Sequence, residues 1–169
     1  MKIKNRFLIY TAFIFALALS SNNAFSQQFQ KSYKDWSVYT TKRDGLNLCY
    51  MVSYPKRKNG NYNKRGQPYV MITNINGQIS EVSATGGYPY KNNTEPRVII
   101  DGEEHRLSMT KNETAWFKTD EYDAIVIGKM KKGHKMTVKG TSKRGTYSID
   151  TYSLSGFTSA YKKISTLCN

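Results

Sequence analysis

The chain of 169 residues has little of the chemistry that catalytic and metal sites need. It holds two cysteines and two histidines, and its 12 acidic residues face 26 lysines and arginines. No Cys-x-x-Cys pair and no Gly-x-Ser-x-Gly turn occurs, which argues against a cysteine-based metal site and a hydrolase with a nucleophile elbow. After residue 26, no apolar run is long enough to cross a bilayer.

The one long apolar run lies near the N-terminus and has the features of a secretory signal peptide. Three basic residues within the first six precede the 13-residue run 7–19, and Ala24-Phe25-Ser26 offers a cleavage site. Thirteen residues are too few to span a bilayer comfortably, so an uncleaved anchor is the weaker alternative. We predict a signal peptide over residues 1–26 and a single exported β-rich domain over residues 27–169, in the periplasm or associated with the envelope.

The predicted exported part is strongly basic. Removing the three basic residues of the signal lowers the formal net charge from +14 to +11. Such a charge suits anionic partners, although it also serves solubility. Because export argues against nucleic acid, we expect as partner an unknown protein or an anionic envelope component such as lipopolysaccharide or acidic lipid headgroups. Peripheral membrane contact and the oligomeric state stay open.

Both cysteines lie in the predicted exported part. In an oxidising compartment, two cysteines predict one disulfide, here between Cys49 and Cys168. A reactive thiol or a metal-binding pair is the alternative. It is disfavoured because no other cysteine or histidine lies within a few residues of either one.

Short alternating stretches separated by turn residues predict a mainly β domain. Residues 120–132 are ambiguous, because Ile125-Val126-Ile127 favours a strand whereas acids at the start and lysines at the end favour a helix, which we predict. A second helix is predicted over residues 155–167 by apolar residues at helical spacing. The expected fold is a single antiparallel β-sandwich or partly open barrel with these two helices and one disulfide. Strands are predicted over residues 36–41, 48–54, 69–73, 78–84, 97–100, 105–109, 114–118, 134–140 and 146–152.

A cationic loop over residues 56–67 is the candidate binding site. A flexible basic loop with an aromatic side chain, here Tyr62, can hold phosphates or sugar acids. A solvated hairpin loop is the alternative interpretation. The candidate anion-binding residues are Lys56, Arg57, Lys58, Lys64 and Arg65.

An enzyme would have to use His105 or His134, and a periplasmic hydrolase built on either one is the alternative function. Both histidines have charged or turn-forming neighbours, which predicts exposed hairpin or turn positions. They lie 29 residues apart and the acids are scattered, so we predict no metal site, no cofactor and no catalytic residue.

Several segments of the chain together form a recognisable pattern. They are Asp35-Trp36, Cys49-Tyr50 with Ser53 and Pro55, Arg65-Gly66, residues 69–73, Trp116, residues 130–133, residues 140–145, and residues 150–157 before Cys168. The order of these segments resembles the invasion-associated locus B family of alphaproteobacterial envelope proteins over nearly all of residues 35–168. The resemblance implies a periplasmic or envelope-associated β-rich domain, and we expect an exported, non-enzymatic binding protein. Some family members carry additional cysteines that this chain lacks.

Overall fold

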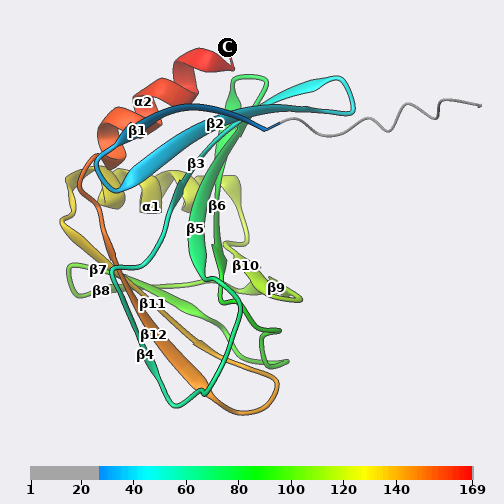
Figure 1. Ribbon diagram of the computed structural model, residues 1–169, viewed down its shortest axis with the longest axis vertical. Coiled ribbons are helices and arrows are strands. Elements are labelled where there is room, and N and C mark those ends of the chain that lie inside the picture. The colour runs from blue at the N-terminus through cyan, green and yellow to red at the C-terminus, as the bar shows by residue number, and fades with distance from the viewer. Residues whose placement is uncertain (1–26, 169) are drawn as a thin grey trace, which may run out of the picture.

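The computed structural model describes residues 27–168, which form two β-sheets and two helices (Figure 1). The predicted signal peptide lies outside the described residues. In chain order the elements are β1 (Gln28–Tyr33), β2 (Trp36–Arg43), β3 (Leu46–Ser53), β4 (Arg57–Gly60), β5 (Tyr69–Ile75), β6 (Gln78–Thr85), β7 (Arg97–Ile100), β8 (Glu103–Arg106), β9 (Met109–Lys111), β10 (Thr114–Trp116), α1 (Asp120–Lys132), β11 (Lys135–Thr141), β12 (Tyr147–Ser153) and α2 (Phe157–Leu167).

The two sheets are antiparallel throughout and neither closes into a barrel. One has seven strands in the order β1-β2-β3-β5-β6-β10-β9, and the other has five in the order β4-β12-β11-β7-β8. Both helices pack on the seven-stranded sheet, α1 against β6 and α2 against β2 and β3 (Figure 1). The predicted mainly β fold with two helices is confirmed.

Helix α1 has the predicted bounds. Its N-cap is Thr119, whose side-chain oxygen accepts a hydrogen bond from the Tyr122 N–H at 3.3 Å. Three acids in the first turn and three lysines in the last complement the helix dipole. The β-branched run does not prevent the helix, because Val126 and Ile127 bury their side chains in the core.

Helix α2 begins at Phe157, two residues later than predicted, and its N-cap is Gly156. Gly156 has a φ of +90°, a conformation that favours glycine. The helix buries Phe157, Ala160 and Ile164, as its periodicity predicts.

The predicted disulfide is confirmed: Cys168, just after the helix, is bonded to Cys49 of β3, with 5.9 Å between the two Cα atoms.

Three strand predictions are wrong, the first because no strand is predicted over residues 28–33, where β1 lies. Residues 57–60 lie in the predicted loop but form β4, an edge strand paired only with β12. Its sequence, Arg-Lys-Asn-Gly, has no apolar alternation that could have indicated a strand. The strand predicted over 105–109 is two strands in different sheets. The chain leaves β8 at Leu107, whose N–H donates to the Pro96 carbonyl at 2.8 Å.

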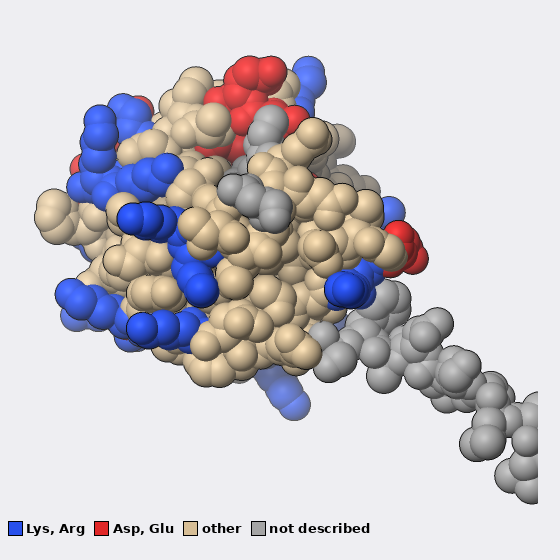
Figure 2. All heavy atoms as spheres, turned by 90° about the horizontal axis from the view of Figure 1, so that it is seen from above, with Lys and Arg blue, Asp and Glu red and all other residues tan. Residues whose placement is uncertain are grey.

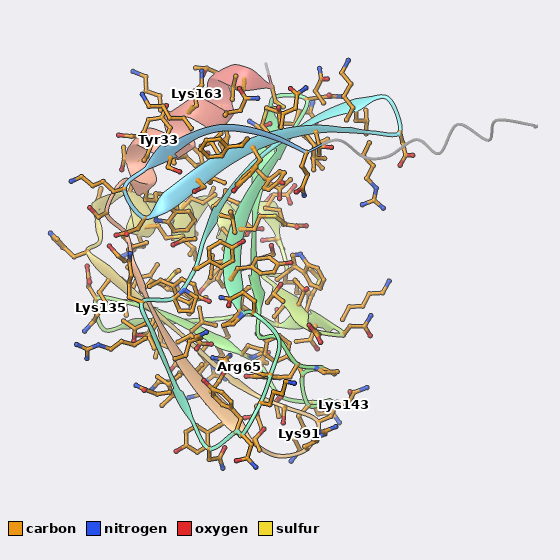
Figure 3. The ribbon with its side chains drawn as sticks, viewed as in Figure 1. Tyr33, Arg65, Lys91, Lys135, Lys143 and Lys163 are labelled. Carbon is orange, nitrogen blue, oxygen red and sulfur yellow. A yellow bond between two sulfur atoms is a disulfide. The ribbon has the colours of Figure 1, made fainter. Side chains whose placement is uncertain are left out.

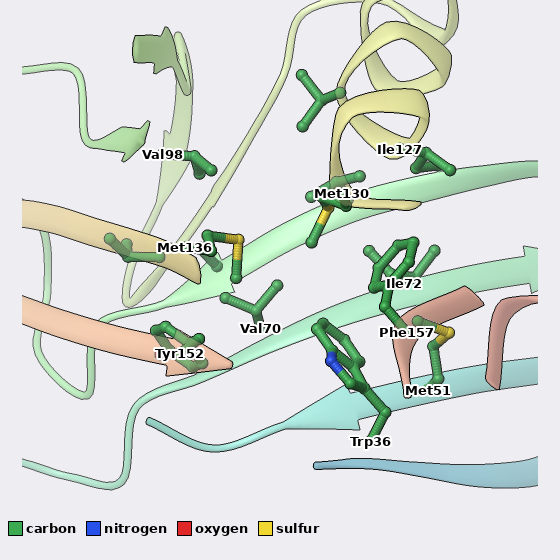
Figure 4. Close-up of a cluster of buried hydrophobic side chains, with 14 of the residues drawn as sticks. Trp36, Met51, Val70, Ile72, Val98, Ile127, Met130, Met136, Tyr152 and Phe157 are labelled. Carbon is green, nitrogen blue, oxygen red and sulfur yellow. The ribbon is translucent and has the colours of Figure 1, made fainter. Parts of the chain in front are cut away.

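The core lies where the two sheets and both helices meet (Figure 4). Trp36 is central: its ring contacts Phe157 edge-on at 5.0 Å between ring centres, and its Nε1–H donates to the Ser153 carbonyl at 3.1 Å. This arrangement joins the seven-stranded sheet, α2 and the end of β12. Other fully or almost fully buried side chains here are Met51, Val70, Ile72, Val98, Ile127, Met130, Met136 and Tyr152.

Removing the disulfide is expected to destabilise the domain strongly. The two cysteines are 119 residues apart, and in the chain-entropy model a loop of this length contributes about 4–5 kcal/mol to the free energy of unfolding. The C49S/C168S variant should therefore unfold at a much lower urea concentration than the oxidised wild type. Equal midpoints for the two proteins would contradict the expectation.

Asp123 is expected to make the stability depend on pH. Its carboxylate is buried and accepts the Val82 N–H at 2.8 Å, and burial raises its pKa to about 6. The pKa in the unfolded chain is about 4, so the folded state binds more protons between these values and the contribution of Asp123 to stability falls as the pH rises from about 4 to about 6.

The D123N variant tests this because its amide oxygen still accepts the Val82 N–H but carries no charge. Urea unfolding at pH 4.5 and 7.5 measures the free energy of unfolding of both proteins. Any fall in this free energy from pH 4.5 to pH 7.5 should be smaller in D123N than in the wild type. The same change in both proteins would show that Asp123 does not titrate in this range.

Candidate functional site

A buried ion pair between Arg65 and Asp150 lies beneath the candidate site. The two side chains are only 4% and 2% exposed. Both terminal nitrogens of Arg65 donate to the carboxylate, with 2.8 Å between Nη1 and Oδ2. Nη1 also donates to the Gly86 carbonyl at 2.8 Å, and Nη2 to the Tyr62 hydroxyl at 3.2 Å. The pair thereby fastens the segment between β4 and β5 to β12.

Tyrosine rings surround the arginine. The guanidinium carbon lies 4.4 Å from the ring centre of Tyr62 and 5.9 Å from that of Tyr88. The Tyr88 hydroxyl is hydrogen-bonded to the Ser148 hydroxyl at 2.6 Å. Burial opposes the charged form of Arg65, but the hydrogen bonds and charge of Asp150 outweigh it and raise the arginine pKa above its ordinary value. Arg65 therefore stays charged.

Two glycines allow the backbone to approach this cluster. Gly87 has a φ of +72° and lies against Gly66, whose N–H donates to the Gly87 carbonyl at 2.8 Å. A Cβ on Gly140 would lie 2.6 Å from Cε1 of Tyr90 and 2.8 Å from the Tyr88 hydroxyl. Larger residues at these positions would push the tyrosines and the loop apart.

A pocket of about 670 Å³ adjoins the ion pair, a volume typical of small-molecule sites. Hydrogen bonds fix its walls: the Lys143 N–H donates to the Pro89 carbonyl at 2.9 Å, and the Tyr147 N–H donates to the Asn61 side chain at 2.7 Å. The walls are therefore built before any ligand arrives. The lining residues are Asn61, Tyr62, Asn63, Lys64, Arg65, Gly87, Tyr88, Pro89, Glu113, Ser142, Lys143, Arg144 and Thr146.

The rim of the pocket is basic. Lys64, Lys143 and Arg144 line it and are exposed, and none of them makes an ion pair with any residue between 27 and 168. Glu113 is the one acid among the lining residues. Figure 3 shows Arg65, Lys91 and Lys143 toward the same end of the molecule, away from α2. The lining of the pocket thus carries three exposed cations against one acid, Glu113, and none of the three forms an ion pair with it.

The structure divides the five cations of the predicted basic loop. Lys64 lines the pocket, but Arg65 is buried against Asp150 and Lys56 forms an ion pair with Asp35. Arg57 and Lys58 are exposed on β4. Anion binding by these residues stays a prediction, and the structure separates the positions that line the pocket from those that do not.

Sequence reasoning missed Lys143 and Arg144 as site residues. They lie in the turn between β11 and β12, far along the chain from Lys64. Their one signal was their place in the segment 140–145, which contributed to the family resemblance. The pairing of β4 with β12 and the ion pair between Arg65 and Asp150 bring the two segments together.

The prediction that His105 is exposed is wrong. It is 3% exposed, and its Nδ1 lies 3.2 Å from the Tyr122 hydroxyl. Alternation along β8 directs it inward toward α1, whereas its charged neighbours point to solvent. His134 is exposed as predicted, with a side chain 94% exposed. Neither histidine lines the pocket.

Residues 27–168 contain neither a cluster of metal ligands nor a membrane-spanning helix. No group of three or more His, Cys, Asp or Glu side chains is placed to hold a metal ion in this part of the chain. Neither of its helices is both long and apolar enough to span a bilayer.

A family comparison covers most of the chain. The family model described as Invasion associated locus B (IalB) protein matches residues 36–165. The chain belongs to the IalB family. Membership indicates an envelope-associated protein, and the Cys49–Cys168 disulfide of this IalB protein fits export. No curated protein and no solved structure gives a significant match.

Breaking the buried pair is expected to be costly. The D150N variant leaves the Arg65 charge buried without its counter-ion, which should lower the free energy of unfolding by about 3–5 kcal/mol. The double variant R65M/D150L removes both charges and should be clearly more stable than the sum of the effects of R65M and D150L predicts. Urea unfolding of R65M, D150L and R65M/D150L measures the coupling between the two charges. Additive effects would show that the two charges do not stabilise each other.

Proposed function

We propose that this IalB protein is an envelope-associated, non-enzymatic binding protein that holds an anionic component in the basic pocket. The observation that carries the proposal is the convergence of Lys64, Lys143 and Arg144 on one preformed cavity that has a single acid in its lining.

Electrostatics favours an anion at this position. Positive side chains gathered around one cavity repel each other, and a cavity with low-dielectric walls concentrates their field. None of the three cations forms an ion pair with an acid among residues 27–168, and Glu113 is the one acid that shares the cavity with them. A bound anion relieves the repulsion and gains attraction from each of them.

A binding role is supported over hydrolysis by the positions of the histidines. His105 is packed between β8 and α1 against Tyr122, and His134 follows α1 at an exposed position. The hydrolase alternative depends on His105 or His134 acting next to the bound substrate, and neither lines the basic pocket.

Positive charge is not confined to the pocket. Figure 2 views the end of the molecule where α2 lies, opposite the pocket, and shows lysines and arginines spread around it with a separate acidic patch. The whole molecule therefore attracts anions through its net charge. A test of the pocket must compare variants that lose the same charge at different places.

The chain offers such a matched pair of variants. K64S/K143S/R144S removes the three pocket cations, and K56S/R57S/K58S removes three cations at and before β4 that do not line the pocket. We expect the pocket variant to bind lipopolysaccharide at least tenfold more weakly than the wild type at about 0.15 M salt, where charges are screened over about 8 Å. The β4 variant should lose less than threefold. Co-sedimentation with lipopolysaccharide aggregates measures both affinities.

Circular dichroism and thermal unfolding of both variants verify that each is folded. Equal losses of affinity in the two variants would show that net charge alone attracts the anion. Unchanged binding in the pocket variant would remove the pocket as the site.

A further inference from the structure

The lining of the basic pocket indicates more than the charge of its ligand. We propose, resting on the proposed function, that the pocket binds an acidic saccharide, a short run of sugar rings that carry phosphate or carboxylate groups. The inference depends on four features: cations on two walls, a mixed aromatic and amide lining, a pair of hydroxyl groups, and one buried donor without a partner.

The cations approach the cavity from two separate segments. Lys64 belongs to the segment between β4 and β5, whereas Lys143 and Arg144 belong to the turn between β11 and β12. A ligand that engages both walls needs anionic groups at more than one point or an extended body between them. The volume of about 670 Å³ leaves room for such a body.

The rest of the lining suits a body with both apolar and hydroxyl-bearing surfaces. The rings of Tyr62, Tyr88 and Pro89 present apolar surface, on which the C–H faces of sugar rings pack. Asn61 and Asn63 add amide groups beside them. The Asn61 side-chain oxygen already accepts the Tyr147 N–H, so a hydrocarbon chain would leave the Asn63 amide and the Asn61 NH₂ group without hydrogen-bond partners once water is displaced.

The turn side of the cavity adds hydroxyl groups. Ser142 and Thr146 are hydrogen-bonded to each other at 2.7 Å. A hydroxyl pair shares one proton between its oxygens, so the other proton and the remaining lone pairs are available to a ligand. Sugar hydroxyls, which both donate and accept, match groups of this kind.

Arg65 supplies the independent indication of a ligand. Its two terminal nitrogens are engaged by Asp150, Gly86 and Tyr62, but its Nε–H is buried and has no hydrogen-bond partner among the described residues. The side chain is 4% exposed and is part of the pocket lining. A buried donor without an acceptor is costly, so we expect the side chains that cover Nε to shift when the saccharide binds and one of its oxygens to accept from it.

Titration calorimetry with three probes separates sugar recognition from simple anion binding. The probes are the deacylated, phosphorylated core oligosaccharide of lipopolysaccharide, the same oligosaccharide after dephosphorylation, and tripolyphosphate. Protein expressed with its native N-terminal segment and purified from the periplasm should bind the first probe at least tenfold more tightly than either of the others. The K64S/K143S/R144S variant should lose most of this affinity.

A nuclear magnetic resonance titration reports on the site directly. The Nε–H signal of Arg65, assigned by its absence in R65K, should shift when the phosphorylated oligosaccharide is added and stay in place with tripolyphosphate. N63A should weaken oligosaccharide binding at least threefold, because it removes an amide from the lining. N59A, an equivalent change on the exposed strand β4, should leave the affinity unchanged.

The outcomes distinguish the inference from the proposed function. If tripolyphosphate binds as tightly as the oligosaccharide and N63A has no effect, the pocket is an anion site and the saccharide inference is wrong. If the Arg65 signal does not move with the oligosaccharide, the saccharide inference is also wrong. If no anionic probe depends on Lys64, Lys143 and Arg144, both the inference and the proposed function fail.

Discussion

The ion pair between Arg65 and Asp150 is the interaction on which the part of the molecule around the five-stranded sheet and the basic pocket depends. Burying two charges is expensive unless each is paired and hydrogen-bonded. Here Asp150 takes both terminal nitrogens, while Gly86 and Tyr62 accept the protons that remain on them. The ion pair holds the segment after β4 against β12, and this contact sets one wall of the basic pocket. The same network also determines how close the tyrosine rings can approach.

The two helices and the disulfide could be predicted because each depends on local sequence patterns or on composition. The acids and lysines at the two ends of α1 located that helix despite its β-branched centre, and the apolar spacing of Phe157, Ala160 and Ile164 located α2. The disulfide followed from the compartment and the cysteine count. Each of these features depends on neighbours in sequence or on composition, which a single sequence reports.

Features that depend on tertiary pairing could not be predicted in the same way. Strand β4 has no apolar residue, so only its pairing with β12 shows that it is a strand. His105 has charged neighbours on both sides and is buried because α1 covers it. Arg65 looked like one of five surface cations, whereas its partner Asp150 lies in a strand far along the chain. The pocket combines segments that no sequence spacing connects.

The position of the disulfide has a consequence for the order of events during folding. Cys49 lies in an early strand, and its partner follows the last helix, 119 residues later. In a chain that is threaded across a membrane from its N-terminus, the first cysteine arrives long before the second and waits as a free thiol. The covalent link therefore cannot guide the first contacts of the sheet. In such a chain the disulfide forms only after β12 and α2 have also emerged. It therefore stabilises a topology that strand pairing has already selected.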